Sequence, residues 1–257
     1  MTVAGRRLWT RDELIAAYRL YCLLPFGRLH KGTAEIIDLA SLLGRTPSSV
    51  AMKLVNLASL DPAIRGSGRK GLGNASDGDR EVWQAFHADW LGMAEESTRV
   101  LQSLGWKEAD SVASREPEMS YEEENREAVV LARLRQSFFR RSVLSSYRGR
   151  CCMTGLSDPT FLVASHIIPW AQNTSNRLNP RNGLCLSTLH DRAYDRGLLT
   201  VLPDYTIRAS PRLRALRGNR LAADWLLGLD GCRIEIPERF LPDSSFLAFH
   251  AQEIFQG

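Results

Sequence analysis

Two histidines and one asparagine in the second half of the chain have the types and spacing for catalysis, because imidazole can accept a proton or bind a metal near pH 7. They are His166, Asn182 and His190. Thr160–Ala164 is a short β-rich run, and a strand there would present the imidazole of His166 at its end. The residues that follow predict a loop, a second strand after Asn182 and a short helix that Ser187 can cap. We expect these elements to place the three side chains around one cleft.

The same region carries most of the positive charge. Residues 128–220 hold 15 arginines against four acidic residues, a net charge of +11, although the whole chain has only +4. The stretches 1–107, 108–127 and 221–257 carry +3, −6 and −4. Such a basic segment predicts a polyanionic partner, most commonly nucleic-acid phosphate. A coding bias would explain 29 Arg against four Lys, but not the shortage of acidic residues.

Length and composition exclude several classes of protein. A chain of 257 residues suits one large domain or two modest ones that need no disulfides. No apolar run approaches the roughly 20 residues that span a bilayer, and the first residues lack the apolar stretch of a signal peptide. An odd number of cysteines, five, suits a reducing compartment. We expect a cytoplasmic protein with no membrane contact.

Residues 1–102 predict an all-α domain. A capping box at Thr10 and Glu13 starts a first helix, which Pro25 ends. Helices over Thr33–Leu43 and from Thr46 to Asn56 are joined by a tight turn and look like a helix-turn-helix. In that interpretation the side chains that face a DNA groove are Ser48, Ser49, Lys53 and Asn56. Ordinary packing of two helices is the alternative.

The middle of the chain predicts a boundary between two domains. One long helix is expected around Asp79–Leu101, using Val82, Trp83, Phe86 and Trp90 as its buried face. Residues 103–120 are poor in apolar side chains and are expected to be a linker. A second capping box at Ser120 predicts a helix that runs to about Tyr147, within a second domain over residues 121–257.

The second domain resembles the HNH endonuclease family. The resemblance rests on four elements in order, which are His166 after a strand, Asn182-Gly183-Leu184, Leu189-His190 and Tyr194-Asp195-Arg196-Gly197. The helical part is similar to a module found ahead of such nucleases in restriction endonucleases. The resemblance implies an α+β protein, in which an all-α, helix-turn-helix-like domain precedes a ββα-metal nuclease domain with flanking helices. It also implies metal-dependent hydrolysis of phosphodiester bonds in double-stranded DNA.

The resemblance assigns roles to individual residues. His166 is the expected general base, His190 a metal ligand, and Asn182 fixes the loop or orients His166. Many family members have Asp or His as a ligand just before the base, where this chain has Ser165, and a hydroxyl is a poor ligand for Mg²⁺. Either Asp195 supplies a carboxylate, or His190, phosphate and water hold the ion, or this copy is weakly active. A further alternative is that Asp195 caps the end of the helix and pairs with an arginine.

We expect one divalent cation, Mg²⁺ or alternatively Mn²⁺. A structural zinc is not expected, because Cys151 and Cys152 are adjacent, Cys185 stands alone and two CxxC pairs are lacking. These three, with Cys22 and Cys232, are predicted to be core residues. The arginines expected to bind backbone phosphates are Arg177, Arg181, Arg192 and Arg196.

Two functions remain open at this point. The first is a restriction or defence-type endonuclease, for which dependence on base modification is undecided and a homodimer is expected if both strands are cut. The second is a DNA-binding regulator that has lost catalysis. Ser165 favours the regulator, whereas the presence of both His166 and His190 favours the enzyme.

Overall fold

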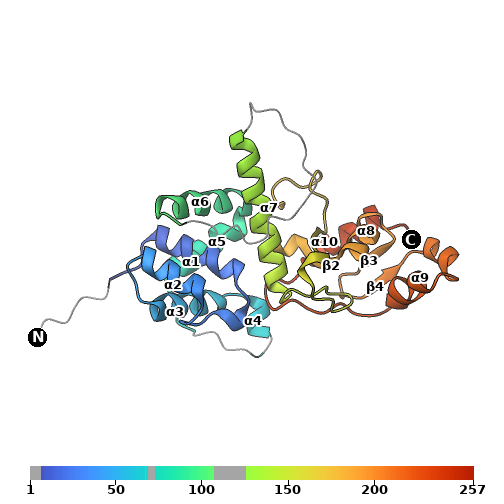
Figure 1. Ribbon diagram of the computed structural model, residues 1–257, viewed down its shortest axis with the longest axis horizontal. Helices are drawn as coiled ribbons and strands as arrows, with labels where there is room; N and C mark the ends of the chain where they lie inside the picture. The colour runs from blue at the N-terminus through green and yellow to red at the C-terminus, as the bar shows by residue number, and fades with distance from the viewer. Residues whose placement is uncertain (1–6, 67, 69–72, 107–125) are drawn as a thin grey trace, which may run out of the picture.

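The structure is a computed structural model that describes residues 7–66, 68, 73–106 and 126–257, without the side chains of residues 126–132. A helical half and a half that contains all the described strands lie on two sides of the long helix α7 (Arg126–Ser146) (Figure 1). No described helix has both the length and the apolar character needed to cross a bilayer.

The helical half contains six described helices. They are α1 (Arg11–Leu23), α2 (Ala34–Leu42), α3 (Pro47–Ala58), α4 (Pro62–Gly66), α5 (Asp77–Ala88) and α6 (Trp90–Ser103). The predicted capping box at the start of α1 is confirmed, with both reciprocal hydrogen bonds between Thr10 and Glu13 present. The single helix expected over Asp79–Leu101 is wrong. The non-helical backbone of Asp89 separates α5 from α6, and its carboxylate caps α6 by accepting from the Gly92 amide at 2.9 Å.

Helix α7 joins the two halves of the molecule. It contacts α1 and α6 on one side and the strands β1 and β2 on the other. Phe138 and Phe139 are buried in these contacts. The predicted end of this helix near Tyr147 is confirmed by its last residue, Ser146, whereas its expected start at Ser120 lies outside the described residues.

The second half is built on two small antiparallel sheets. In the first, β1 (Leu162–His166) pairs with β2 (Gly183–Ser187), with His166 opposite Gly183. In the second, β3 (Leu199–Val201) pairs with β4 (Ile207–Ala209). The remaining helices are α8 (Thr188–Asp195), α9 (Arg220–Trp225) and α10 (Ser244–Phe249).

Two glycines allow close packing around α8 and the first sheet. A Cβ atom at Gly183 would collide with the Val143 side chain of α7, so the start of β2 needs glycine for this helix to approach. Gly197 has a φ of +64°, and a Cβ atom there would collide with the Ile254 carbonyl oxygen. The chain can therefore turn tightly after α8 and pack against the C-terminal segment.

The hydrophobic core is continuous between the two halves. After β4 the chain returns to the helical half, where the buried guanidinium of Arg239 donates to the Tyr21 carbonyl and to Ser145 Oγ at 2.8 Å. The next residue, Phe240, packs edge-on against the rings of Tyr21 and Trp90. The proposed boundaries at 102 and 121 stay a prediction, but removing the helical half would uncover this buried arginine and aromatic ring.

Candidate active site

The end of β1 and the start of α8 form the frame of the candidate site. β1 and β2 are joined by a loop that spans residues 167–182, and α8 contacts both strands. Ser187 is the N-cap of α8, because its hydroxyl accepts from the His190 amide at 3.4 Å. The helix therefore starts where β2 ends and lies across the strand that carries Ser165 and His166.

His166 is held in one orientation by its neighbours. Its ring stacks on Phe139 at 3.9 Å between centroids and meets the edge of Trp170 at 5.5 Å. Nε2 lies 2.9 Å from the Arg177 carbonyl oxygen, which only accepts, so Nε2 carries the hydrogen and Nδ1 has a lone pair. Burial lowers the pKa of His166, although the carbonyl partly opposes this change. The ring is therefore neutral at pH 7 and can accept a proton at Nδ1.

Asn182 ties the two ends of the loop together. Its side-chain oxygen accepts from the Ile168 amide at 2.8 Å, and its amide donates to the Ile168 and Asn176 carbonyl oxygens at 3.2 and 3.3 Å. Its side chain is buried and, among the described residues, forms no hydrogen bond with His166. The geometry matches the first role expected of Asn182, which is to fix the loop, and not the second, which is to orient His166.

His190 does not lie in the position expected of a metal ligand. It is fully buried, with Nδ1 2.6 Å from Ser187 Oγ and Nε2 2.8 Å from the Trp225 carbonyl oxygen. Both ring nitrogens thus have protein partners in the structure, an arrangement that differs from the one expected of a metal ligand beside His166 and Asn182, and the metal-binding role of His190 stays a prediction. Burial lowers the pKa of His190, but contacts with Cys151 and the Trp225 carbonyl outweigh this effect and raise it.

Two carboxylates of α8, Asp191 and Asp195, are one helical turn apart on the same face of this helix. Burial raises the pKa of both, and the charge of Asp191 raises the pKa of Asp195 further. The Ser165 hydroxyl is close enough to lower the pKa of Asp191, yet it is buried and forms no hydrogen bond of regular geometry. Sequence analysis named Asp195 and Ser165 but missed Asp191, which the i,i+4 spacing of two acids on a predicted helix would have indicated.

These oxygen donors suit a hard divalent cation. Carboxylate oxygens are the ligands that Mg²⁺ and Mn²⁺ prefer, and a bound cation would offset the repulsion between Asp191 and Asp195. The Ser165 hydroxyl, which has no hydrogen bond of regular geometry, lies beside Asp191. Among the described residues, no group of three His, Cys, Asp or Glu side chains is arranged to hold a metal. The ligand set that fits best is therefore two carboxylates completed by water and phosphate oxygens.

The four arginines expected to bind phosphate fall into two pairs. Arg177 donates to the Trp170 carbonyl oxygen at 2.7 Å and stacks over its ring, and Arg181 forms an ion pair with Asp243 at 3.0 Å. Arg192 and Arg196 are exposed on α8 and at its C-cap, next in sequence to the two carboxylates. The second pair is thus free to reach a ligand beside α8, whereas the first pair already has protein partners.

All five cysteines are unpaired. Cys22, Cys151, Cys152 and Cys185 are buried as predicted, but Cys232 is exposed, so the prediction for that residue is wrong. Burial would raise the pKa of the Cys151 thiol, but hydrogen bonding with His190 and other groups outweighs it and lowers the pKa to about 7.

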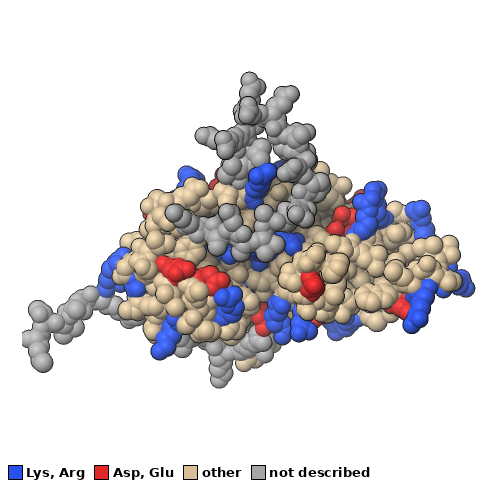
Figure 2. Space-filling view, in the orientation of Figure 1, with Lys and Arg blue, Asp and Glu red and all other residues tan. Residues whose placement is uncertain are grey.

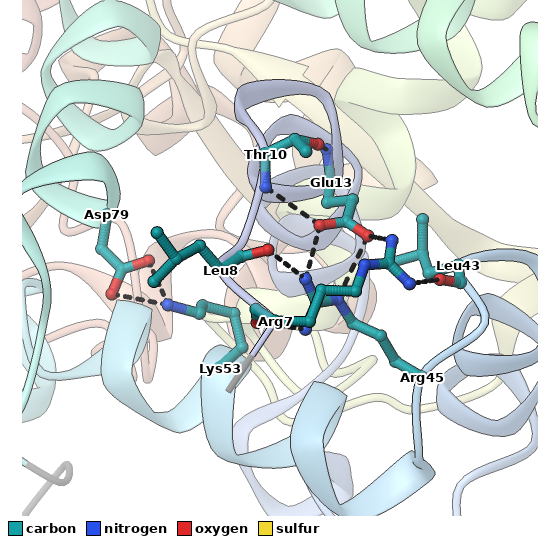
Figure 3. Close-up of polar contacts among 8 residues, drawn as sticks. All are labelled: Arg7, Leu8, Thr10, Glu13, Leu43, Arg45, Lys53 and Asp79. Atoms are coloured by element: carbon teal, nitrogen blue, oxygen red, sulfur yellow. Dashed lines mark hydrogen bonds and ion pairs between the residues drawn. The ribbon is translucent and has the colours of Figure 1, made fainter. Parts of the chain in front are cut away.

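Helix α3 does not present the expected DNA-reading face. Lys53 is buried and its ammonium group lies 2.8 and 3.0 Å from the two carboxylate oxygens of Asp79 in α5 (Figure 3). Asn56 is also buried, so the prediction that these two side chains face a DNA groove is wrong. Ser48 is exposed and Ser49 half-buried at the start of α3, and only these two remain accessible.

Arg45, in the turn between α2 and α3, likewise forms its contacts within the helical half. It forms an ion pair with Glu13 at 2.7 Å and donates to the Leu8 carbonyl oxygen at 2.7 Å (Figure 3). The turn is therefore anchored to the segment before α1. The structure contains a helix pair with a short turn, but no arrangement that establishes a DNA-reading helix-turn-helix.

Comparison with known families identifies one segment of the chain. Residues 151–202 match the model of a family described as HNH endonuclease. This segment includes β1, β2, α8 and β3, and thereby His166, Asn182 and the two carboxylates of α8. No curated protein matches the chain.

Proposed function

We propose that this protein, whose residues 151–202 match an HNH endonuclease family, is a metal-dependent endonuclease that hydrolyses phosphodiester bonds in double-stranded DNA. The observation that carries this proposal is an imidazole with a free lone pair at the end of β1, together with two carboxylates on α8, the helix that packs against this strand. His166 ends β1, and its neighbour Ser165 lies beside Asp191 of α8. In the described part of the chain, no hydrogen bond or ion pair joins the His166 ring to Asp191 or Asp195.

The proposed roles follow from the atoms that each residue leaves available. His166 Nδ1 accepts the proton of the attacking water, while the Arg177 carbonyl and Phe139 hold the ring in place. Asp191 and Asp195 would hold Mg²⁺ or Mn²⁺, and the ion would supply positive charge that neutralises the charge developing on the phosphate. Arg192 and Arg196 bind the flanking phosphates. Asn182 keeps the loop closed so that the Arg177 carbonyl stays in position.

The biological setting is part of the proposal. A restriction or defence-type enzyme is supported by a helical half that precedes the nuclease segment, with Ser48 and Ser49 accessible on α3. Cutting both strands would require two active sites and thus a homodimer. Five unpaired cysteines suit a reducing compartment such as the cytoplasm.

The second candidate function is a regulator that binds DNA without cutting it. It is favoured by Ser165 in place of a carboxylate and by the inward orientation of His190, which together remove two of the expected ligands. The Asp191 and Asp195 pair favours the enzyme, because it supplies two oxygen ligands from other positions.

The test is cleavage of supercoiled plasmid, modified and unmodified, by full-length protein with Mg²⁺, Mn²⁺ or EDTA. We expect cutting that needs the divalent ion and falls about 10²–10⁴-fold in His166→Ala, the usual range for a lost general base. Asp191→Asn with Asp195→Asn should abolish cutting, whereas Asp38→Asn, at an exposed position of α2, should not change it.

Two outcomes would reject the assignments. Equal cutting by His166→Ala and the wild-type protein would remove the role given to His166. DNA binding without cutting under every metal and modification state would favour the regulator.

A further inference from the structure

Residues 208–220, called the arginine arm below, form the most basic short segment of the second half. They contain Arg208, Arg212, Arg214, Arg217 and Arg220 and no acidic residue. The arm includes the last two residues of β4, a 3₁₀ turn over Pro211–Leu216 and the first residue of α9. It lies outside the segment that matches the HNH family, at the end of the molecule beyond α8 (Figure 1).

All five guanidinium groups of the arm belong to exposed residues. Figure 2 shows basic side chains along the outline of this end of the molecule, over the region of α8 and α9, with few acidic ones among them. The exposed residues of the arm are therefore placed to meet a large partner rather than a small ligand in a pocket.

The positive charge of the arm is almost uncompensated. Arg208 and Arg214 donate no side-chain hydrogen bond and form no ion pair with any described residue, and Arg217 donates only to the Arg214 carbonyl oxygen. Arg212 donates to the neutral amide of Gln256. Arg220 pairs with Asp224 at 3.5 Å, but both are exposed, and such a pair contributes little. The fold does not use these charges for its own stability, in contrast to buried Arg239.

The arm is connected to α8 through α9, the helix that follows it. Its Leu213 is buried, and Asn219 caps α9 by accepting from the Ala222 amide at 3.1 Å. The carbonyl of Trp225, the last residue of α9, binds His190 Nε2 of α8 at 2.8 Å. The helix that carries Asp191 and Asp195 is therefore connected directly to the element that follows the arm, so the arginines have a set position relative to the site.

We propose that the arginine arm is a second phosphate-binding surface, which holds duplex DNA outside the active site and beside α8. The proposal rests on the proposed function for the identity of its partner. Positive charge that is exposed, unpaired and preorganised is attracted to the DNA backbone, and each contact releases condensed counterions. His190 becomes a positioning residue in this arrangement, because it connects α8 to α9.

The test is DNA binding by full-length protein in EDTA, so that binding is measured without cleavage. Fluorescence anisotropy with a 30-base-pair duplex would give the affinity between 50 and 300 mM NaCl. We compare Arg214→Ala/Arg217→Ala with Arg80→Ala/Arg99→Ala, a control that removes the same charge from exposed positions of α5 and α6. Arg214→Lys/Arg217→Lys keeps the charge and should restore binding.

The expected result follows from the two phosphate-binding guanidinium groups that the arm variant lacks. Each arginine bound to a phosphate contributes about 0.9 to the slope of log affinity against log salt, so the arm variant should lose about 1.8 from the slope and roughly 10- to 60-fold in affinity at 0.1 M salt. The control should keep the slope of the wild-type protein, with both variants folded by circular dichroism.

Failure of this proposal can be distinguished from failure of the proposed function. An arm variant with unchanged slope and affinity overturns the proposal even if the wild-type protein cuts DNA, and so does a wild-type protein that binds no duplex. A reduced slope in the arm variant alone supports the proposal, whether or not plasmid cleavage is observed.

Discussion

The ion pair between Lys53 and Asp79 provides the sharpest test of whether this face of α3 stabilises the fold or contacts DNA. Both partners are buried, with side-chain exposures of 9% and 0%, and the ammonium group contacts both carboxylate oxygens. Replacing Lys53 with Met keeps the apolar stem but leaves Asp79 as a buried carboxylate without its cation. Breaking a buried pair in this way costs roughly 3–5 kcal/mol of unfolding free energy.

The expected loss is at the lower end of that range. Asp79 retains a second partner in Lys53→Met, because its carboxylate also accepts from the Ser76 amide at 2.8 Å as part of the α5 capping box. We therefore expect about 3 kcal/mol, which corresponds to a fall of about 6–12 °C in the melting temperature of a chain of this size. Urea denaturation followed by circular dichroism would measure the free energy, and a thermal melt would measure the temperature.

Two controls show whether a loss of stability in Lys53→Met comes from the broken ion pair. Ser48→Ala alters an exposed residue of the same helix and should change the free energy by no more than about 0.5 kcal/mol. Lys53→Met/Asp79→Leu removes both charges and should regain much of the loss. The reasoning is refuted if Lys53→Met leaves stability unchanged but lowers the salt dependence of DNA binding, since that result would mean that Lys53 contacts phosphate.

Two further predictions concern the buried histidines. His190→Ala should lower the free energy of unfolding by about 1–3 kcal/mol, because it leaves the Trp225 carbonyl and the Ser187 hydroxyl without their buried partner. A metal titration of plasmid cleavage should be unchanged, and a large rise in the Mg²⁺ concentration needed would show that His190 is a ligand after all. Burial lowers the pKa of His250 to about 4, from an ordinary value near 6.5, so the neutral form stabilises the fold above pH 6.5. This contribution, about 3 kcal/mol, should be lost as the pH falls from 6.5 to 4. The free energy of unfolding of His250→Asn, measured by urea denaturation, should fall less over the same pH range.

The sequence alone determined the elements whose signals are local. The capping box of α1, the short turn between α2 and α3, and the order of strand, loop, strand and helix were all predicted correctly. Hydrogen bonds between residues close in sequence and hydrophobic periodicity set these features, so no distant contact was needed. The motif around His166 and Asn182 also sufficed to predict the resemblance to the HNH family, which residues 151–202 match.

Only the tertiary structure decided which way individual polar side chains point. Lys53 and Asn56 face inward because α5 packs on that side of α3 and supplies Asp79. His190 is buried with its Nε2 bound by the Trp225 carbonyl, 35 residues later in the chain. Periodicity shows that a helix has two faces, but the elements packed against the helix determine which face is buried. Asp191 of α8 was placed beside Ser165 for the same reason, through contacts between α8 and β1 that no local pattern encodes.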